Sequence, residues 1–225
     1  NMQNIGKRMS LAITLPLTVL GVKSVTVAAQ FEQSMANAFS VMGGASDEAK
    51  AKLTALAEQL GKDTAFKASE AAEAMYYLAS AGLKVDEIYG TLPGVLDLAA
   101  ATATDLAFAS EQVVANMGRF NLTSKDTGRI ADVMAKGIAS SQLTMERLTD
   151  FMQYAGPVAS QFNGSLEETV AVGGVLSKVM GTKMAQAGSG LQAMFRKLVN
   201  PTKEVGDVLS ELGVTMEEVS PAKVG

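Results

Sequence analysis

Two stretches of this chain follow the same pattern, and the pattern limits what the chain can fold into. Each has a turn, a polar start, about four helical turns with one apolar face, and an exit beside a glycine. The stretches are FKASEAAEAMYYLASAG at 66–82 and NGSLEETVAVGGVLSKVMG at 163–181. In the second, Ser165 and Glu168 match the S-x-x-E capping box, in which each side chain satisfies a backbone N–H of the first turn. In the first, Lys67 stands at the cap position, so only the glutamate half is expected.

The rest of the chain is punctuated in a similar way. Ser46, Thr104-Asp105, Thr123 and Thr144 are expected to cap further helices. The chain therefore divides into roughly nine or ten helices joined by connections of two to eight residues. Alternating strand patterns are nearly absent. The predicted fold class is all-α: a multi-helix array of short amphipathic helices with a longer N-terminal helix and no sheet.

Prolines are expected to interrupt two of these helices. Pro93 is predicted to begin a fresh helix after a break at Gly90, and Gly156-Pro157 is predicted to stop another. Near the end of the chain, an apolar stripe over 187–198 (Ala187, Leu191, Met194, Phe195 and Leu198) predicts a further helix. A last helix is expected from Pro201 through Leu212.

The apolar residues of this chain are unusual in kind. The hydrophobic fraction is 48%, with 13 Met, 21 Gly and no Trp. Small side chains let helices approach closely, while Met fills irregular gaps. We expect close helix packing at Gly173 with Gly174 and at Gly188 with Gly190. Gly188-Ser-Gly190-x-x-Ala193 also matches a loose dinucleotide-binding pattern, but it lacks the preceding strand that this motif requires.

The N-terminal stretch Leu11–Ala29 is apolar and follows Lys7 and Arg8. One interpretation is a long helix whose stripe, stepping by threes and fours, packs against its own copies. Another is a segment that enters a membrane under particular conditions, although Pro16 and Lys23 oppose a simple span. A secretory signal would also need a cleavage site and a true N-terminus. The self-association seam is predicted at Ile13, Leu17, Leu20, Val27, Phe31 and Met35.

Charge and residue types exclude several functions. The net charge is −4 with scattered cations, which does not suit specific nucleic-acid binding. The chain has no cysteine and no histidine, so thiolate sites, imidazole ligands and Ser-His-Asp triads are impossible. Carboxylate chemistry would need positioned acids, but Glu70, Glu73, Glu167 and Glu168 fall near helix starts, where capping explains them. We expect no catalytic site, no metal site and no cofactor.

The order of motifs along the chain resembles the core region of phage tail tape measure proteins. The similar segments are FEQSMANAF at 31–39, ALAEQLGKDTAFKASEAAEAMYYLASAG at 55–82, PGVLDLAAATATDLAFASEQV at 93–113, RIADVMAKG at 129–137, QFNGSLEETVAVGGVLSKV at 161–179 and GSGLQAMFRKLVNPTKEVGDVLSELGV at 188–214. TLPLTVLGV at 14–22 is similar to the segment that precedes this core. Lys67, where the family often has Ser or Thr, is a departure.

The resemblance implies a structural protein and not an enzyme. Tape measure proteins occupy the lumen of the tail tube, set its length during assembly and leave ahead of DNA during ejection. The implied locations are the virion tail, at the tube lumen or tip, the host cytoplasm during assembly and the host envelope during ejection. The alternative is a membrane-active, channel-forming segment delivered into the host envelope.

The resemblance also implies partners and a domain division. Expected partners are further copies of the chain (most often three), the tail tube protein, baseplate or tail tip hub proteins, a tail assembly chaperone and the host membrane, with no specific nucleic acid. The expected division is an N-terminal apolar helix over 1–44, a core helical module over 45–200 and the start of a following helical segment over 201–225, in a chain that continues beyond.

Overall fold

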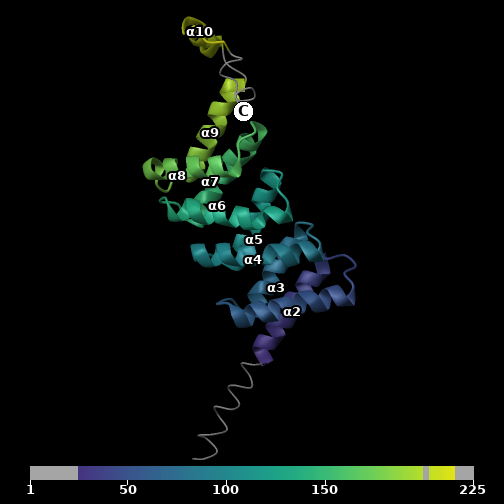
Figure 1. Cartoon of the computed structure of the whole chain (residues 1–225). Coiled ribbons are helices and arrows are strands. Elements are labelled where there is room, and N and C mark those ends of the chain that lie inside the picture. Colours follow the sequence, from purple (N-terminus) through teal and green to yellow (C-terminus); the bar gives the residue numbers. More distant parts are fainter. Residues whose placement is uncertain (1–24, 200–202, 216–225) are drawn as a thin grey trace, which may run out of the picture. The chain divides into compact units, whose positions relative to one another are not determined.

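The computed structural model describes residues 25–199 and 203–215, and every helix or strand assigned in these ranges is a helix (Figure 1). Residues 25–41 are helical and belong to the longer N-terminal helix expected from the sequence. The elements that follow are α2 (Asp47–Asp63), α3 (Ala68–Ser80), α4 (Val85–Thr102), α5 (Leu106–Arg119), the 3₁₀ turn η1 (Ser124–Asp126), α6 (Thr127–Ala139), α7 (Met145–Gln161), α8 (Leu166–Met180), α9 (Met184–Val199) and α10 (Lys203–Glu211). The all-α prediction is confirmed for the described residues.

The chain packs as two units that divide between Val85 and Asp86. In the first unit, the helix over 25–41, α2 and α3 bury Met35, Ala38, Leu53, Leu56, Ala57, Met75 and Leu78. In the second unit, α4 to α8 bury Ile88, Leu92, Leu98, Leu106, Ile130, Met134, Leu148, Phe151 and Leu166. The domain boundaries expected at 44 and 200 stay a prediction, because this division concerns packing alone.

Helices start at the caps that the sequence predicted. The Ser46 hydroxyl accepts a hydrogen bond from the Ala49 N–H at 3.2 Å, and the Asp105 carboxylate accepts one from the Ala107 N–H at 2.9 Å. Each cap satisfies a backbone donor that has no partner within its own helix. The entry of the chain into each of these helices is thus set by local chemistry.

The two copies of the repeated pattern differ at their starts as expected. At α8 the box is complete: the Glu168 N–H donates to Ser165 Oγ at 3.2 Å, and the Ser165 N–H donates to Glu168 Oε2 at 2.9 Å. At α3 the Lys67 N–H donates to Glu70 Oε2 at 2.9 Å. A lysine side chain offers no acceptor, so this box keeps its glutamate half only.

Both copies also end alike. Gly82 follows α3 with φ of +89°, and Gly181 follows α8 with φ of +56°. Residues other than glycine adopt positive φ only at a steric cost, so glycine suits these exits. The chain therefore turns away after α3 and after α8 instead of continuing as one long helix.

The predicted proline breaks were wrong. Pro93 lies inside α4 and Pro157 lies inside α7. A proline lacks the N–H that would bond the carbonyl four residues earlier, which belongs to Tyr89 in α4 and Gln153 in α7. Both prolines and both of these partner residues are exposed, so water can satisfy the freed carbonyls.

Packing on the opposite face explains why these helices continue. In α4, Ile88 and Leu92 are buried before or beside the proline, and Val95, Leu96 and Ala99 are buried after it. Ending the helix at Pro93 would turn part of this face away from the core. Because tertiary burial of an apolar face supplies most of a helix's stability, the cost of the proline is outweighed.

The cap at α8 predicts a dependence of stability on pH. Hydrogen bonds from the Ser165 backbone N–H and hydroxyl lower the pKa of Glu168 from its ordinary value. A carboxylate whose pKa is lower in the folded state stabilises the fold above its unfolded pKa and loses that contribution as the pH falls through the folded value. We expect the urea midpoint of the chain to fall between pH 7 and pH 3, and to fall less in Glu168→Gln.

The matched control is Glu111→Gln, because Glu111 is exposed in the middle of α5 and caps no helix. This variant should keep the wild-type decline in urea midpoint. An identical decline in both variants would show that the cap does not contribute to the acid sensitivity of the second unit.

Candidate functional site

The closest helix packing in the second unit surrounds Phe151, a fully buried residue of α7. A Cβ atom added to Gly173 of α8 would lie 2.9 Å from Phe151 Cδ1. A Cβ atom added to Gly188 of α9 would lie 2.5 Å from the backbone oxygen of Phe151. Both distances are below what real Cβ atoms show, so α8 and α9 approach α7 only because these positions have no side chain. Gly137 of α6 makes a similar approach to Val170 of α8.

The other two glycines expected at close contacts lie in different surroundings. A Cβ atom at Gly174 would meet the Ser141 Cβ at 3.4 Å, which is an ordinary contact. Gly190 is exposed on α9, and a Cβ atom there would meet no atom within 4 Å. Gly190 therefore does not bring two helices of the described chain together.

The predicted self-association seam is described only in part. Ile13, Leu17 and Leu20 lie outside the described residues. Val27 is 60% exposed, Phe31 is half-buried and Met35 is buried at 4% exposure. Met35 is thus used inside the first unit, together with Ala38. Whether Val27 and the residues before it pair with other copies stays a prediction.

A two-pronged ion pair joins α6 to α8. Arg129 Nε and Nη2 donate to the two carboxylate oxygens of Glu167 at 2.6 and 2.8 Å. The hydrogen bonds from Arg129 lower the pKa of Glu167, and the same carboxylate raises the pKa of Arg129. This pair accounts for Glu167 as a structural residue, as capping accounts for Glu168. Both side chains remain partly exposed, so the pair orients two helices more than it stabilises them.

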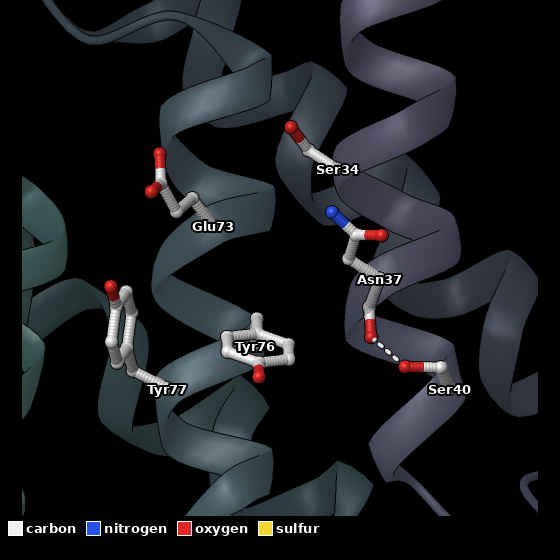
Figure 2. Close-up of a pocket in the computed structure, with 6 residues that line it drawn as sticks. All are labelled: Ser34, Asn37, Ser40, Glu73, Tyr76 and Tyr77. Carbon is white, nitrogen blue, oxygen red and sulfur yellow. Dashed lines mark hydrogen bonds between the residues drawn. The ribbon is translucent and has the colours of Figure 1, made fainter.

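A polar cleft of about 490 Å³ lies in the first unit between the helix over 25–41 and α3 (Figure 2). Its lining residues are Ser34, Asn37 and Ser40 on one helix and Glu73, Tyr76 and Tyr77 on the other. The Ser40 hydroxyl donates to the Asn37 carbonyl at 2.6 Å, which turns it back onto its own helix. Figure 2 shows Glu73, Tyr76 and Tyr77 pointing in different directions, so they do not converge on one point.

An apolar groove of about 300 Å³ lies in the second unit. The stacked rings of Phe162 and Phe195, with centroids 5.2 Å apart, form part of its wall. The groove is lined by Ala159, Phe162 and Gly164 after or within α7, by Glu168, Thr169 and Val172 of α8, and by Leu191, Met194 and Phe195 of α9. The sequence identified the α9 residues as an apolar stripe, but the stripe alone did not show that part of it stays open to solvent.

Catalytic and membrane features were sought over the same described residues. Among them no cluster of three or more acidic side chains could hold a metal ion. No single described helix is both long and apolar enough to cross a membrane; α4 and α5 meet the criteria only as a pair, bent by 117°. Most of the apolar stretch Leu11–Ala29 lies outside the described residues, so its membrane activity stays a prediction.

The packing at Phe151 predicts opposite effects for two glycines of α9. Alanine is favoured over glycine inside a helix by about 0.5–1 kcal/mol, so Gly190→Ala, in open space, should raise the free energy of unfolding by that amount. Gly188→Ala places a Cβ against a backbone oxygen and should lower it by about 1–3 kcal/mol. Urea unfolding of the chain measures both. An increase in both variants would contradict the close approach of α7 and α9.

Comparison with known proteins places this arrangement in a family. A model of the family described as phage-related minor tail protein matches residues 54–224. The tape measure protein of Pneumococcus phage Dp-1 is 36% identical over 216 residues, which cover 96% of this chain and 19% of that protein. The probable tape measure protein of Escherichia phage P2 is 32% identical over 217 residues, covering 95% of this chain and 26% of that protein. No solved structure matches.

The chain thus spans about a fifth to a quarter of the length of the curated relatives it matches. The family match takes in α3 to α10, including the capping box at Ser165 and the glycines at Phe151. The resemblance deduced from the order of motifs is confirmed. The chain belongs to the phage-related minor tail protein family.

Proposed function

We propose that this chain is a folded segment of a tape measure protein, carried in the tail of a phage or of a phage-derived particle. The family match and the names of two relatives, each aligned over nearly the whole chain, support this role. The role is structural. The carboxylates considered for catalysis support this, because Glu70, Glu167 and Glu168 are engaged in caps or ion pairs.

The observation that carries the finer proposal is the breaking of the chain into short, packed helices. A continuous α-helix extends by about 1.5 Å per residue, so a polypeptide used as a ruler is most effective when it is straight. Here α3 and α8 end at glycines with positive φ, and α7, α8 and α9 pack tightly around Phe151. We assign this segment to a compact module beside the measuring part of the parent protein, acting at the start of assembly or in ejection.

The proposed module would meet several partners. Copies of the same chain, the inner wall of the tail tube, baseplate or tip proteins and an assembly chaperone fit a tape measure segment. The cores are rich in Ala and Met, including Ala71, Ala72, Met75, Met134 and Met152. Such side chains repack more readily than large branched or aromatic ones, which suits a protein that must leave the tail before DNA does.

Tail length distinguishes a compact module from a ruler. Deleting residues 86–199 in frame from the parent gene removes α4 to α9 from Asp86 onward. A measuring rod would give infectious tails that are shorter by about 1.5 Å for each deleted residue. A module for initiation or ejection predicts failed assembly, or tails of normal length that do not infect. Electron microscopy and plaque counts give the two readouts.

Two substitutions that keep the chain length sharpen this test. Gly188→Leu should disrupt packing at Phe151 and reproduce the defect of the deletion, whereas Gly190→Leu adds a side chain in open space and should not. Normal, infectious tails from Gly188→Leu together with proportionally shortened tails from the deletion would overturn the compact-module proposal.

The membrane-active alternative has one observation in its favour. Residues 25–30 of the N-terminal helix are all exposed, and Val25 and Val27 are 70% and 60% exposed. An apolar helix with no packed side can bury its residues in a bilayer. Under this alternative, a peptide of residues 5–32 should become helical and sediment with liposomes, measured by circular dichroism and co-sedimentation. Absence of binding would confine this segment to contacts with protein.

A further inference from the structure

We propose that α10 of one copy of this chain packs into the apolar groove of a second copy. The inference goes beyond the proposed function and does not depend on it. It starts from two apolar surfaces in the second unit that are both left open. In the groove, Met194 is 50% exposed; on α10, Val208 is 54% exposed, and Leu212, which directly follows the helix, is 68% exposed.

The shape of the groove fits a helix. It lies between α8 and α9 and is closed at one side by Phe162 after α7. A furrow between two packed helices receives the side-chain ridge of a third. The furrow is extended along α8, because Val175 and Val179 continue the line of Val172 and are 65% and 84% exposed. Exposed valines in such a row, next to aromatic rings, are typical of a surface that binds a partner.

α10 has the pattern that such a groove requires. Val205, Val208, Leu209 and Leu212 recur at positions i, i+3, i+4 and i+7, which places them on one face of a helix. Leu209 is half-buried, while Val208 and Leu212 are exposed. Within the described chain, α10 packs extensively against no other element. Its apolar face therefore lacks a partner within one copy.

Charges at the edges of the two surfaces are complementary. Arg196 and Lys197 are exposed directly after Phe195 at the end of α9. On α10, Asp207 and Glu211 are exposed beside Val208 and Leu212. Opposite charges around an apolar centre orient a docking helix and reject other partners. Glu168, on the α8 side of the groove, has a counterpart in Lys203 of α10.

A second copy is the occupant that satisfies both surfaces at once. Each copy provides one groove and one α10, so exchange between copies covers every open surface, as closed assemblies of identical chains require. Exchange between copies is also consistent with the exposure of both surfaces in a single chain.

The absence of cysteine from the chain allows a direct test. The full chain is made as two single-cysteine variants, Met194→Cys and Val208→Cys, one carrying a tag that changes its mass. A disulfide forms only when two Cα atoms come within about 7 Å of each other. After mixing and mild oxidation, we expect a mixed, disulfide-linked pair on a non-reducing gel. The control is Ser210→Cys in place of Val208→Cys, because Ser210 is exposed on the opposite face of α10.

The double variant Met194→Cys/Val208→Cys identifies the source of the helix. Docking between copies predicts linked chains of twice the mass or more. A bridge within single chains, with no mixed pair in the first experiment, would show that α10 covers the groove of its own copy and would overturn the proposal. Equal linking of Met194→Cys to Val208→Cys and to Ser210→Cys, or no linking at all, would overturn it too.

A charge exchange gives an independent readout. Asp207→Lys should weaken association of the full chain, measured by sedimentation, because it places a third cation beside Arg196 and Lys197. Combining Asp207→Lys with Arg196→Glu should restore it in part. Both residues are exposed, so neither change should affect folding of the chain. No change in association with Asp207→Lys would remove the charge complementarity from the argument.

Discussion

The second unit depends on the close approach of two helix backbones to Phe151. Gly173 and Gly188 bring α8 and α9 against the ring and the carbonyl of this residue. The contact at Gly188 is with a backbone atom, which cannot move aside as a flexible side chain can. Since protein interiors are packed as tightly as organic crystals, a single methyl group there would separate α7 and α9. Removing the side chain, and not adding an attractive one, makes this packing possible.

The two prolines show how solvent and core act on opposite faces of one helix. Pro93 and Pro157 lie on exposed faces, where water replaces the hydrogen bonds that they remove. The buried faces of α4 and α7 run past them without interruption. A proline thus interrupts a helix only when the hydrogen bond that it removes cannot be replaced. The same residue on a buried face would leave a carbonyl unpaired in the core, at a cost of about 1–3 kcal/mol.

A chain packed through small residues buries its core but leaves apolar side chains outside it. Val175, Val179 and Met194 are exposed in the second unit, and Val208 and Leu212 are exposed at its end. A monomeric enzyme of this size rarely leaves such rows open. In a component of a phage tail, which exists to assemble, these surfaces are what further copies or neighbouring proteins can cover. The polar cleft lined by Glu73 and Tyr76 is of a different kind, since its groups do not converge.

The sequence by itself determined where most helices begin and end. The capping box at Ser165, the half box at Lys67 and the exits at Gly82 and Gly181 are local, because each involves backbone groups within a few residues. Such contacts form in the same way whatever the rest of the chain does. The order of motifs was also sufficient to recognise the family. Only the tertiary structure decided that α4 and α7 continue through proline, because that depends on which face is buried. It also decided that Gly188 touches α7 while Gly190 does not, and that part of the α9 stripe remains open, because these depend on which helices meet in space.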